Sequence, residues 1–179
     1  LPVVFCIDRA GVRGRDGETH QGVFDLSYHT SIPGITIAVP KDIAEFRAML
    51  RMSVRMKGPL AIRYPREGSE GEKIPENGLE IGKFEVLHST MSDIVILAAG
   101  ERCLNIARRV LRAANAEGMD AALVNARFVK PLDEELLSSL NAHTVITMED
   151  NALIGGLGAA VGGLHRGGGK EVVSLGYRV

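Results

Sequence analysis

The sequence has few cysteines, no tryptophan and no long apolar run. Its 179 residues include two cysteines, Cys6 and Cys103, which lie in apolar surroundings without the CxxC spacing of zinc and redox sites. This argues against a disulfide framework and predicts a reducing, cytoplasmic compartment. No stretch of 18 apolar residues occurs, and the N-terminus lacks the basic-then-apolar order of a secretory signal, so no contact with a membrane is expected.

Aromatic side chains are scarce, and neither sign of charge dominates. The chain has five Phe and three Tyr, and its formal net charge is −1. Residues 1–66 carry ten Lys and Arg against six Asp and Glu, whereas residues 67–179 carry 11 against 16. A basic segment without aromatic side chains interleaved among its charges is a poor platform for stacking nucleic-acid bases. The sequence therefore predicts no nucleic-acid partner and favours a small anionic substrate for the first segment.

Alternating strand and helix signals in the first third predict a parallel sheet. Residues 1–8 form a continuous apolar run of the kind found in strands buried on both faces, which would place Cys6 in the core. Asp42 and Glu45 have the spacing of a helix N-terminus, and apolar residues follow at helical intervals to residue 54. Two further apolar runs predict strands on either side of that helix, at 35–39 and 59–64.

An acidic segment separates this unit from a second one. Residues 67–80 hold five Glu, three Gly and a Pro with few apolar side chains, which predicts a linker. Beyond it, helices are expected around 107–114 and after Asp133, among strands at 84–87, 93–98, 121–124, 144–148 and 172–175. The predicted fold class is α/β, with mainly parallel sheets flanked by helices in two domains. These domains are residues 1–66 and 81–179. Because the chain begins inside a strand signal, we expect it to be part of a longer polypeptide.

Polar residues directly after the predicted strands are the candidates for a ligand site. Loops at the carboxyl ends of parallel strands converge, so the residues after the first three strands, namely Arg9, Lys41 with Asp42, and Arg66, are expected to share one rim. Arg9 and Arg66 could together bind a phosphate, and His20 could transfer protons near neutral pH with Asp16 beside it. The alternatives are that His20 is a surface residue and that Arg66 is solvated or paired with a carboxylate.

Other candidate motifs are weaker. Gly156, Leu157 and Gly158 precede a predicted helix, but the next glycine is one residue too late for a dinucleotide fingerprint, so helix packing is the favoured role. The remaining histidines lack metal-ligand spacing, which predicts structural or exposed roles.

Several longer segments together resemble one enzyme family. They are FCIDRAG at 5–11, DGETHQG at 16–22, FDLSY at 24–28, RYPR at 63–66, RFVKPLD at 127–133 and EDNA at 149–152 with Gly155 and Gly156. In this order they resemble 1-deoxy-D-xylulose-5-phosphate synthase over almost the whole chain. The resemblance implies a transketolase-like fold, comprising the end of the pyrimidine-binding domain and most of the C-terminal domain.

The same resemblance implies an activity and roles for four residues. Members of this family are transferases that condense pyruvate with glyceraldehyde 3-phosphate and release CO2, in isoprenoid and thiamine biosynthesis. It implies that Arg9 and Arg66 bind the acceptor phosphate, that Asp16 contacts its hydroxyls, and that His20 positions substrate and assists proton transfer. Thiamine diphosphate and Mg²⁺ would be bound mainly by the missing N-terminal half, so this chain alone is expected to be inactive. The longer polypeptide is expected to be active and to form a homodimer.

The match is not complete, and alternatives remain open. Glu67 stands where the family usually has glycine, which would place a carboxylate beside the proposed phosphate site. One alternative is the second subunit of a split transketolase or of a two-chain pyruvate dehydrogenase. Another is a non-catalytic module that dimerises through the second domain.

Overall fold

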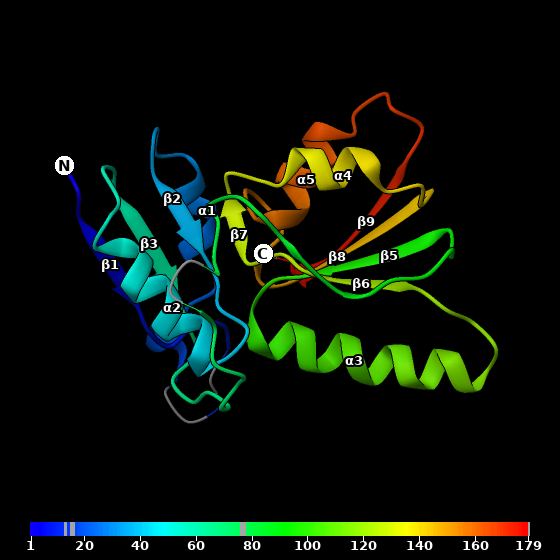
Figure 1. Ribbon diagram of the computed structural model, residues 1–179, viewed down its shortest axis with the longest axis horizontal. Helices are drawn as coiled ribbons and strands as arrows, with labels where there is room; N and C mark the ends of the chain where they lie inside the picture. Colours follow the sequence, from blue (N-terminus) through cyan, green and yellow to red (C-terminus); the bar gives the residue numbers. More distant parts are fainter. Residues whose placement is uncertain (13, 15–16, 76–77, 179) are drawn as a thin grey trace.

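Two β-sheets with helices on their faces make up the chain (Figure 1), which a computed structural model describes at residues 1–12, 14, 17–75 and 78–178. Strands β1, β3 and β2 of the first sheet run parallel, and β7 pairs antiparallel with β2. The order across this sheet is β1 (Val4–Ile7), β3 (Leu60–Arg63), β2 (Thr36–Ala38) and β7 (Phe128–Lys130).

The second sheet has five strands from the remainder of the chain. Strand β4 is antiparallel to β6, and every other neighbouring pair is parallel. The mixed α/β class with two mainly parallel sheets is thereby confirmed. The order across this sheet is β4 (Glu85–His88), β6 (Ala122–Asn125), β5 (Ile94–Ala98), β8 (Thr144–Ala152) and β9 (Glu171–Tyr177).

The two helix starts with an aspartate cap form as their sequences predict. Asp42 accepts a hydrogen bond from the Glu45 amide at 2.7 Å, and Asp133 accepts one from the Leu136 amide at 3.1 Å. Each bond satisfies an amide that has no partner inside its helix. The helices are α1 (Asp25–Thr30), α2 (Ile43–Ser53), α3 (Gly100–Ala116), α4 (Glu134–Ser139) and α5 (Leu157–Leu164), with a 3-10 helix at Glu18–His20.

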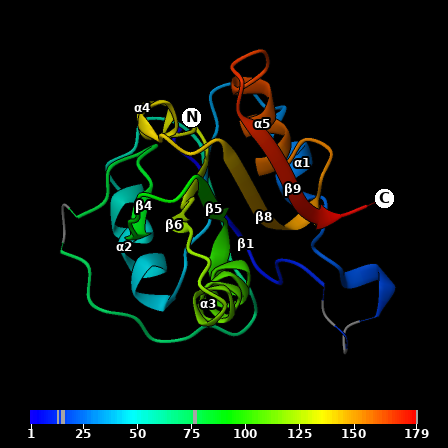
Figure 2. The same ribbon diagram turned by 90° about the vertical axis from the view of Figure 1, so that its right-hand side faces the viewer.

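The apolar core continues from one sheet to the other. Helix α2 covers one face of the first sheet, and α3 covers one face of the second. Figure 2 shows α3 and α5 on opposite sides of the second sheet. The faces turned away from α2 and α3 share one buried cluster, to which α1, α4 and α5 also contribute. Members of this cluster include Leu26, Ile37, Ala61, Leu97, Val145 and Leu157.

The first strand differs from its prediction. Strand β1 is the edge of its sheet, and Val4 and Phe5 are 38% and 46% exposed, so the prediction of a strand buried on both faces is wrong. Cys6 is exposed for the same reason, because β3 is the only strand paired with β1 among the described residues. Within the described ranges, no helix is both long enough and apolar enough to span a bilayer.

Candidate functional site

The ends of β1 and β3 bring two predicted site residues to one edge of the first sheet. The two strands pair in parallel over their full length. Beyond them, the Ala10 amide donates to the Tyr64 carbonyl at 3.1 Å, so the segments that follow the strands also run together. The backbone thus places Arg9 and Arg66 on the same rim. Arg9 has a left-handed conformation, with φ of 58°, and its Nη1 donates to Asp8 Oδ2 at 2.9 Å.

The loop from Arg9 to Gly22 closes on itself. The Gly11 amide donates to the Gly22 carbonyl at 2.8 Å, and the Gly22 amide donates back at 3.2 Å. Both positions require glycine, because a Cβ at Gly11 would lie 2.5 Å from Asp150 Oδ2 and one at Gly22 would lie 2.6 Å from the Arg9 carbonyl oxygen. The closure brings the end of the loop back to its beginning. We refer to residues 9–22 as the substrate loop, after the ligand-binding role that the sequence predicts for them.

His20 lies near the end of the substrate loop, two residues before the closing Gly22. It is exposed and ends the short 3-10 helix, and its Nδ1 lies 2.9 Å from Thr19 Oγ1 in a hydrogen bond. Asp16 falls outside the residues that the structure describes. The hydrogen bonds between Gly11 and Gly22 therefore link the backbone close to His20 with the backbone close to Arg9.

Two cavities lie on either side of the segment that follows β3. Arg66 lines a cavity of about 480 Å³ with Tyr64 and Phe46, whereas Glu67 lines a cavity of about 830 Å³. Pro65 and Gly68 line both. The carboxylate that replaces the expected glycine thus faces a different cavity from Arg66. Of Arg9, His20 and Arg66, only Arg66 lines either cavity.

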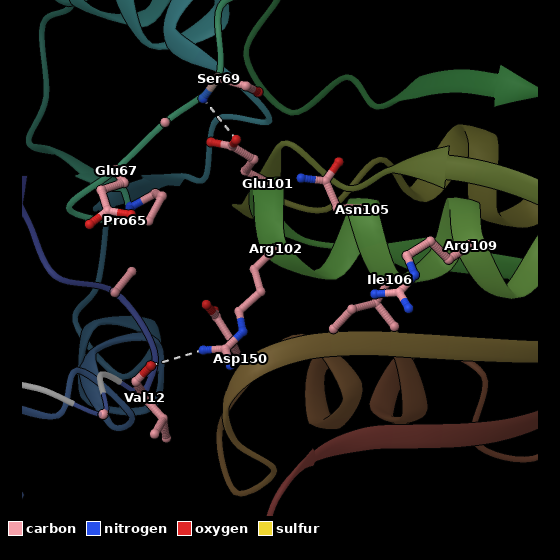
Figure 3. A pocket seen from close by; sticks show the side chains of 13 residues that line it. Val12, Pro65, Glu67, Ser69, Glu101, Arg102, Asn105, Ile106, Arg109 and Asp150 are labelled. Atoms are coloured by element: carbon pink, nitrogen blue, oxygen red, sulfur yellow. Dashed lines mark hydrogen bonds between the residues drawn. The ribbon is translucent and has the colours of Figure 1, made fainter.

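The larger cavity lies between the substrate loop and helix α3 (Figure 3). Arg102 on α3 reaches across it, and its Nη1 donates to the Val12 carbonyl at 2.9 Å. Asp150 from β8 lines the same cavity. The substrate loop is therefore held against an element from the other half of the chain.

Lys41 and Asp42, which were also predicted to lie on the rim, make structural contacts. Lys41 Nζ lies 2.7 Å and 2.5 Å from the two carboxylate oxygens of Glu85 on β4, and Asp42 caps α2. Asp42 also lines the smaller cavity with Arg66. Lys41 is thus directed toward the second half of the chain.

A buried arginine that the sequence analysis left unassigned lies beneath the substrate loop. Arg63, the last residue of β3, is 1% exposed. Its Nε donates to Asp25 Oδ2 at 2.7 Å, and its Nη1 contacts Asp150 Oδ1. Its Nη2 donates at 2.9 Å to the carbonyls of Gly22 and Asp150. The only signal of this buried site in the sequence is a charged residue at the end of an otherwise apolar strand. A charge that is buried in a protein requires partners.

A second buried acid lies beside this group. Glu149 on β8 accepts hydrogen bonds from the Leu157 and Gly158 amides at the start of α5, each at 2.8 Å. Burial raises the pKa of Glu149 to about 7, although these hydrogen bonds favour its charged form. The described residues contain no group of three or more His, Cys, Asp or Glu side chains arranged to hold a metal ion.

Comparison with protein families divides the chain into two matched segments. Residues 1–70 match the transketolase pyrimidine-binding domain, and residues 82–166 match the transketolase C-terminal domain. Among curated proteins, the chain is 42% identical over 182 residues to a 1-deoxy-D-xylulose-5-phosphate synthase of Clostridium tetani, covering 99% of the chain and 29% of that protein. It is 46% identical over 164 residues to the synthase of Thermus thermophilus, covering 90% of the chain and 25% of that protein. The chain thus spans less than a third of these relatives.

Solved structures give the same assignment of fold. One, described as a split-gene transketolase in an inactive β4 tetramer, superposes with a TM-score of 0.85 at 29% identity. The match covers 98% of this chain and 57% of that one. A transketolase from Pichia stipitis superposes with a TM-score of 0.74 at 19% identity, covering 99% of this chain and 26% of that one. The expected transketolase-like fold is confirmed.

Proposed function

The two matched segments belong to the transketolase pyrimidine-binding and C-terminal domain families, and from that premise we propose that the chain is the C-terminal portion of a 1-deoxy-D-xylulose-5-phosphate synthase. This enzyme would be a transferase that condenses pyruvate with glyceraldehyde 3-phosphate and releases CO2. The observation that carries the proposal is 42% to 46% identity to such synthases over 90% to 99% of the chain.

Residues of this chain would bind the phosphorylated acceptor. Arg9 and Arg66 supply two guanidinium groups from one rim, and each could donate charge-assisted hydrogen bonds to the phosphate. Asp16 would contact the acceptor hydroxyls. His20 would transfer a proton to the acceptor oxygen as the new carbon–carbon bond forms, because an imidazole titrates near neutral pH. The shared rim of β1 and β3, together with the closure of the substrate loop, supports this assignment.

The division of the chain and the location of the cofactor follow the same proposal. Residues 1–66 would be the end of the pyrimidine-binding domain, 67–80 the linker and 81–179 the C-terminal domain. Thiamine diphosphate and Mg²⁺ would be held by the N-terminal half of the full-length enzyme, which we expect to be a homodimer. We therefore expect this chain to be inactive alone.

Joining this chain to the N-terminal half tests the proposal. The two parts are mixed or fused and supplied with pyruvate, glyceraldehyde 3-phosphate, thiamine diphosphate and Mg²⁺, and the ketose phosphate product is measured. Removing a charge-assisted phosphate contact by Arg9→Ala should lower kcat/KM about 10- to 100-fold. Removing the proton donor by His20→Ala should lower it about 100-fold or more. Arg112→Ala, at an exposed position on α3, is the control. Unchanged activity in both variants would remove these roles.

A split transketolase subunit is the second candidate, favoured by the structural match to a split-gene transketolase. Such a subunit would act with a separate chain and transfer a group from a ketose donor rather than from pyruvate. Assaying the assembled protein with pyruvate and with a ketose phosphate donor distinguishes the two. Product formed only from the ketose would replace the synthase proposal.

A further inference from the structure

Arg63 connects the three segments that meet beneath the substrate loop. It ends β3, three residues before Arg66, and it contacts Asp25 at the start of α1 and Asp150 on β8. Burial alone would lower its pKa, but the two carboxylates outweigh this effect and raise it, so the guanidinium is charged at every accessible pH. A fixed charge with several partners in a fork geometry holds a side chain in one orientation.

That orientation directs one donor at the point where the substrate loop closes. The Gly22 carbonyl accepts from the Gly11 amide at 2.8 Å and from Arg63 Nη2 at 2.9 Å. The same Nη2 also donates to the Asp150 carbonyl at 2.9 Å. Arg63 therefore adds a partly buried, charge-assisted bond to the closure, and the side chain of Asp150 lies against Gly11.

Because Arg63 joins this closure to the end of β3, the geometry of the closure sets where the predicted ligand groups lie relative to one another. Arg9 begins the substrate loop, His20 lies near its end, and Arg66 follows β3. A guanidinium that binds both the loop and β8 from the end of β3 fixes the distance between these groups. Displacing a substrate-binding group by about 1 Å can lower an enzyme's rate by about 100-fold.

We propose that Arg63 is a positioning residue that holds the substrate loop in register with Arg66 for the phosphorylated acceptor. This inference rests on the function proposed above and adds a residue that does not itself contact substrate. A lysine at this position would keep the charge and could pair with one carboxylate. It lacks the planar fork that binds Asp25, Asp150 and Gly22 together.

Hydrogen exchange on this chain tests the mechanical part of the inference without any assay of activity. In Arg63→Lys, the amides of Gly11 and Gly22 should exchange at least about tenfold faster, because the closure loses its charge-assisted donor. Two controls should leave these amides unchanged. Arg112→Lys alters an exposed arginine of α3, and Asp25→Asn alters the same buried cluster while keeping an oxygen for Arg63 Nε. Equal protection in Arg63→Lys and the parent chain would overturn the inference.

A second variant covers the case in which Arg63→Lys does not fold. Among the described residues, Asp25 Oδ1 is buried without a hydrogen-bond partner. The cluster sets two carboxylates, Asp25 and Asp150, against one arginine, so it holds one carboxylate charge more than Arg63 can neutralise. The double variant Arg63→Lys with Asp25→Asn leaves one cation facing one anion and is easier to accommodate. Faster exchange at Gly11 in this variant than in Asp25→Asn supports the inference, and equal exchange contradicts it.

Kinetics of the assembled enzyme test the consequence for substrate. Arg63→Lys should raise KM for glyceraldehyde 3-phosphate about tenfold and leave KM for pyruvate unchanged. A purely structural role would instead reduce the amount of active enzyme and move neither KM. If the parent assembly makes no product, the proposed function fails while the exchange experiment still decides the role of Arg63. If the parent is active and neither KM changes in the variant, the positioning role is refuted and the proposed function stands.

Discussion

Glu149 is a carboxyl group with very little access to water. It is 4% exposed, and burial raises its pKa to about 7 from the ordinary value of 4.5. The folded chain therefore binds a proton at Glu149 more tightly than the unfolded chain does between these two pH values. The protonated form stabilises the fold below pH 4.5, and this contribution is lost as the pH rises through 7.

We expect the free energy of unfolding to fall between pH 5 and pH 8 by about 3 kcal/mol through this residue, since each unit of pKa shift corresponds to about 1.4 kcal/mol. Urea unfolding followed by far-ultraviolet circular dichroism at several pH values measures this. Glu149→Gln cannot titrate, so the difference between the two proteins isolates Glu149 from other groups such as His165. Parallel pH profiles for the two proteins would show that Glu149 does not titrate in this range.

Single residues with distant partners were the hardest to predict from the sequence. Arg63 pairs with Asp150, which lies 87 positions away, and Glu149 caps a helix whose first residue is Leu157. Neither pairing leaves a periodic signal in the sequence. Arg9 and Arg66 could be placed because each follows a strand signal, and parallel strands end on one edge.

At the scale of the element, the start of α5 depends on close packing around two glycines. A Cβ at Gly156 would overlap Glu149 Oε2, and one at Gly158 would lie 2.8 Å from Thr147 Oγ1 on β8. Both glycines let the helix approach the sheet, which agrees with the packing role favoured from the sequence. Later in the same helix, no atom of the described residues outside the helix's own backbone lies within 4 Å of a Cβ at Gly162.

This contrast predicts opposite effects of the same substitution. Gly156→Ala should lower the free energy of unfolding by about 2 kcal/mol, because the added methyl group displaces a buried carboxylate. Gly162→Ala should raise it by about 0.5 to 1 kcal/mol, because alanine is the better helix former and has room. The midpoints of urea unfolding of the two variants measure both effects. Destabilisation of similar size in both would contradict the packing argument.

Helices and strands whose apolar residues repeat with a clear period were predicted from the sequence. Those stabilised by contacts with distant parts of the chain were not. Helix α3 has an apolar stripe and ends at Ala116, two residues before Gly118, whose φ is 75°, and both features are visible in the sequence. Strand β7 has three residues and follows the charged Arg127, so it carries no strand signal of its own. It forms because β2 offers an open edge. Helix α1 has only six residues, and the side chain of Asn151 accepts a hydrogen bond from the Leu26 amide in its first turn at 3.2 Å.

At the scale of the whole molecule, one buried polar network links the two sheets. Glu45 on α2 is fully buried, and Arg127 Nε lies 3.0 Å from its Oε1. Arg127 Nη2 also pairs with Glu85 on β4 at 2.6 Å, and Asn125 donates to both carboxylates. Burial raises the pKa of Glu45, and Arg127 opposes this by favouring the charged form. The stability of this network therefore depends on each of its side chains.

Breaking this network should destabilise both sheets together. Arg127→Met leaves Glu45 buried without its cation, which typically costs about 3 to 5 kcal/mol. Adding Glu45→Met removes the stranded charge and should recover part of that loss. Arg112→Met, an exposed site, should change stability by less than about 0.5 kcal/mol. Urea unfolding of the four proteins provides the comparison, and a double variant no more stable than Arg127→Met alone would show that the buried charge is not the cause.

The antiparallel pair of β2 and β7 determines how the polypeptide can be dissected. A peptide that ended at residue 66 would lose β7 and leave the edge of β2 with unpaired amides and carbonyls. Open strand edges of this kind recruit other chains, so such a peptide would aggregate rather than fold. A boundary that divides the chain into two folding units should therefore follow the hydrogen bonds between strands. Residues 128–130 belong with the first sheet, although they come after the acidic segment in the sequence.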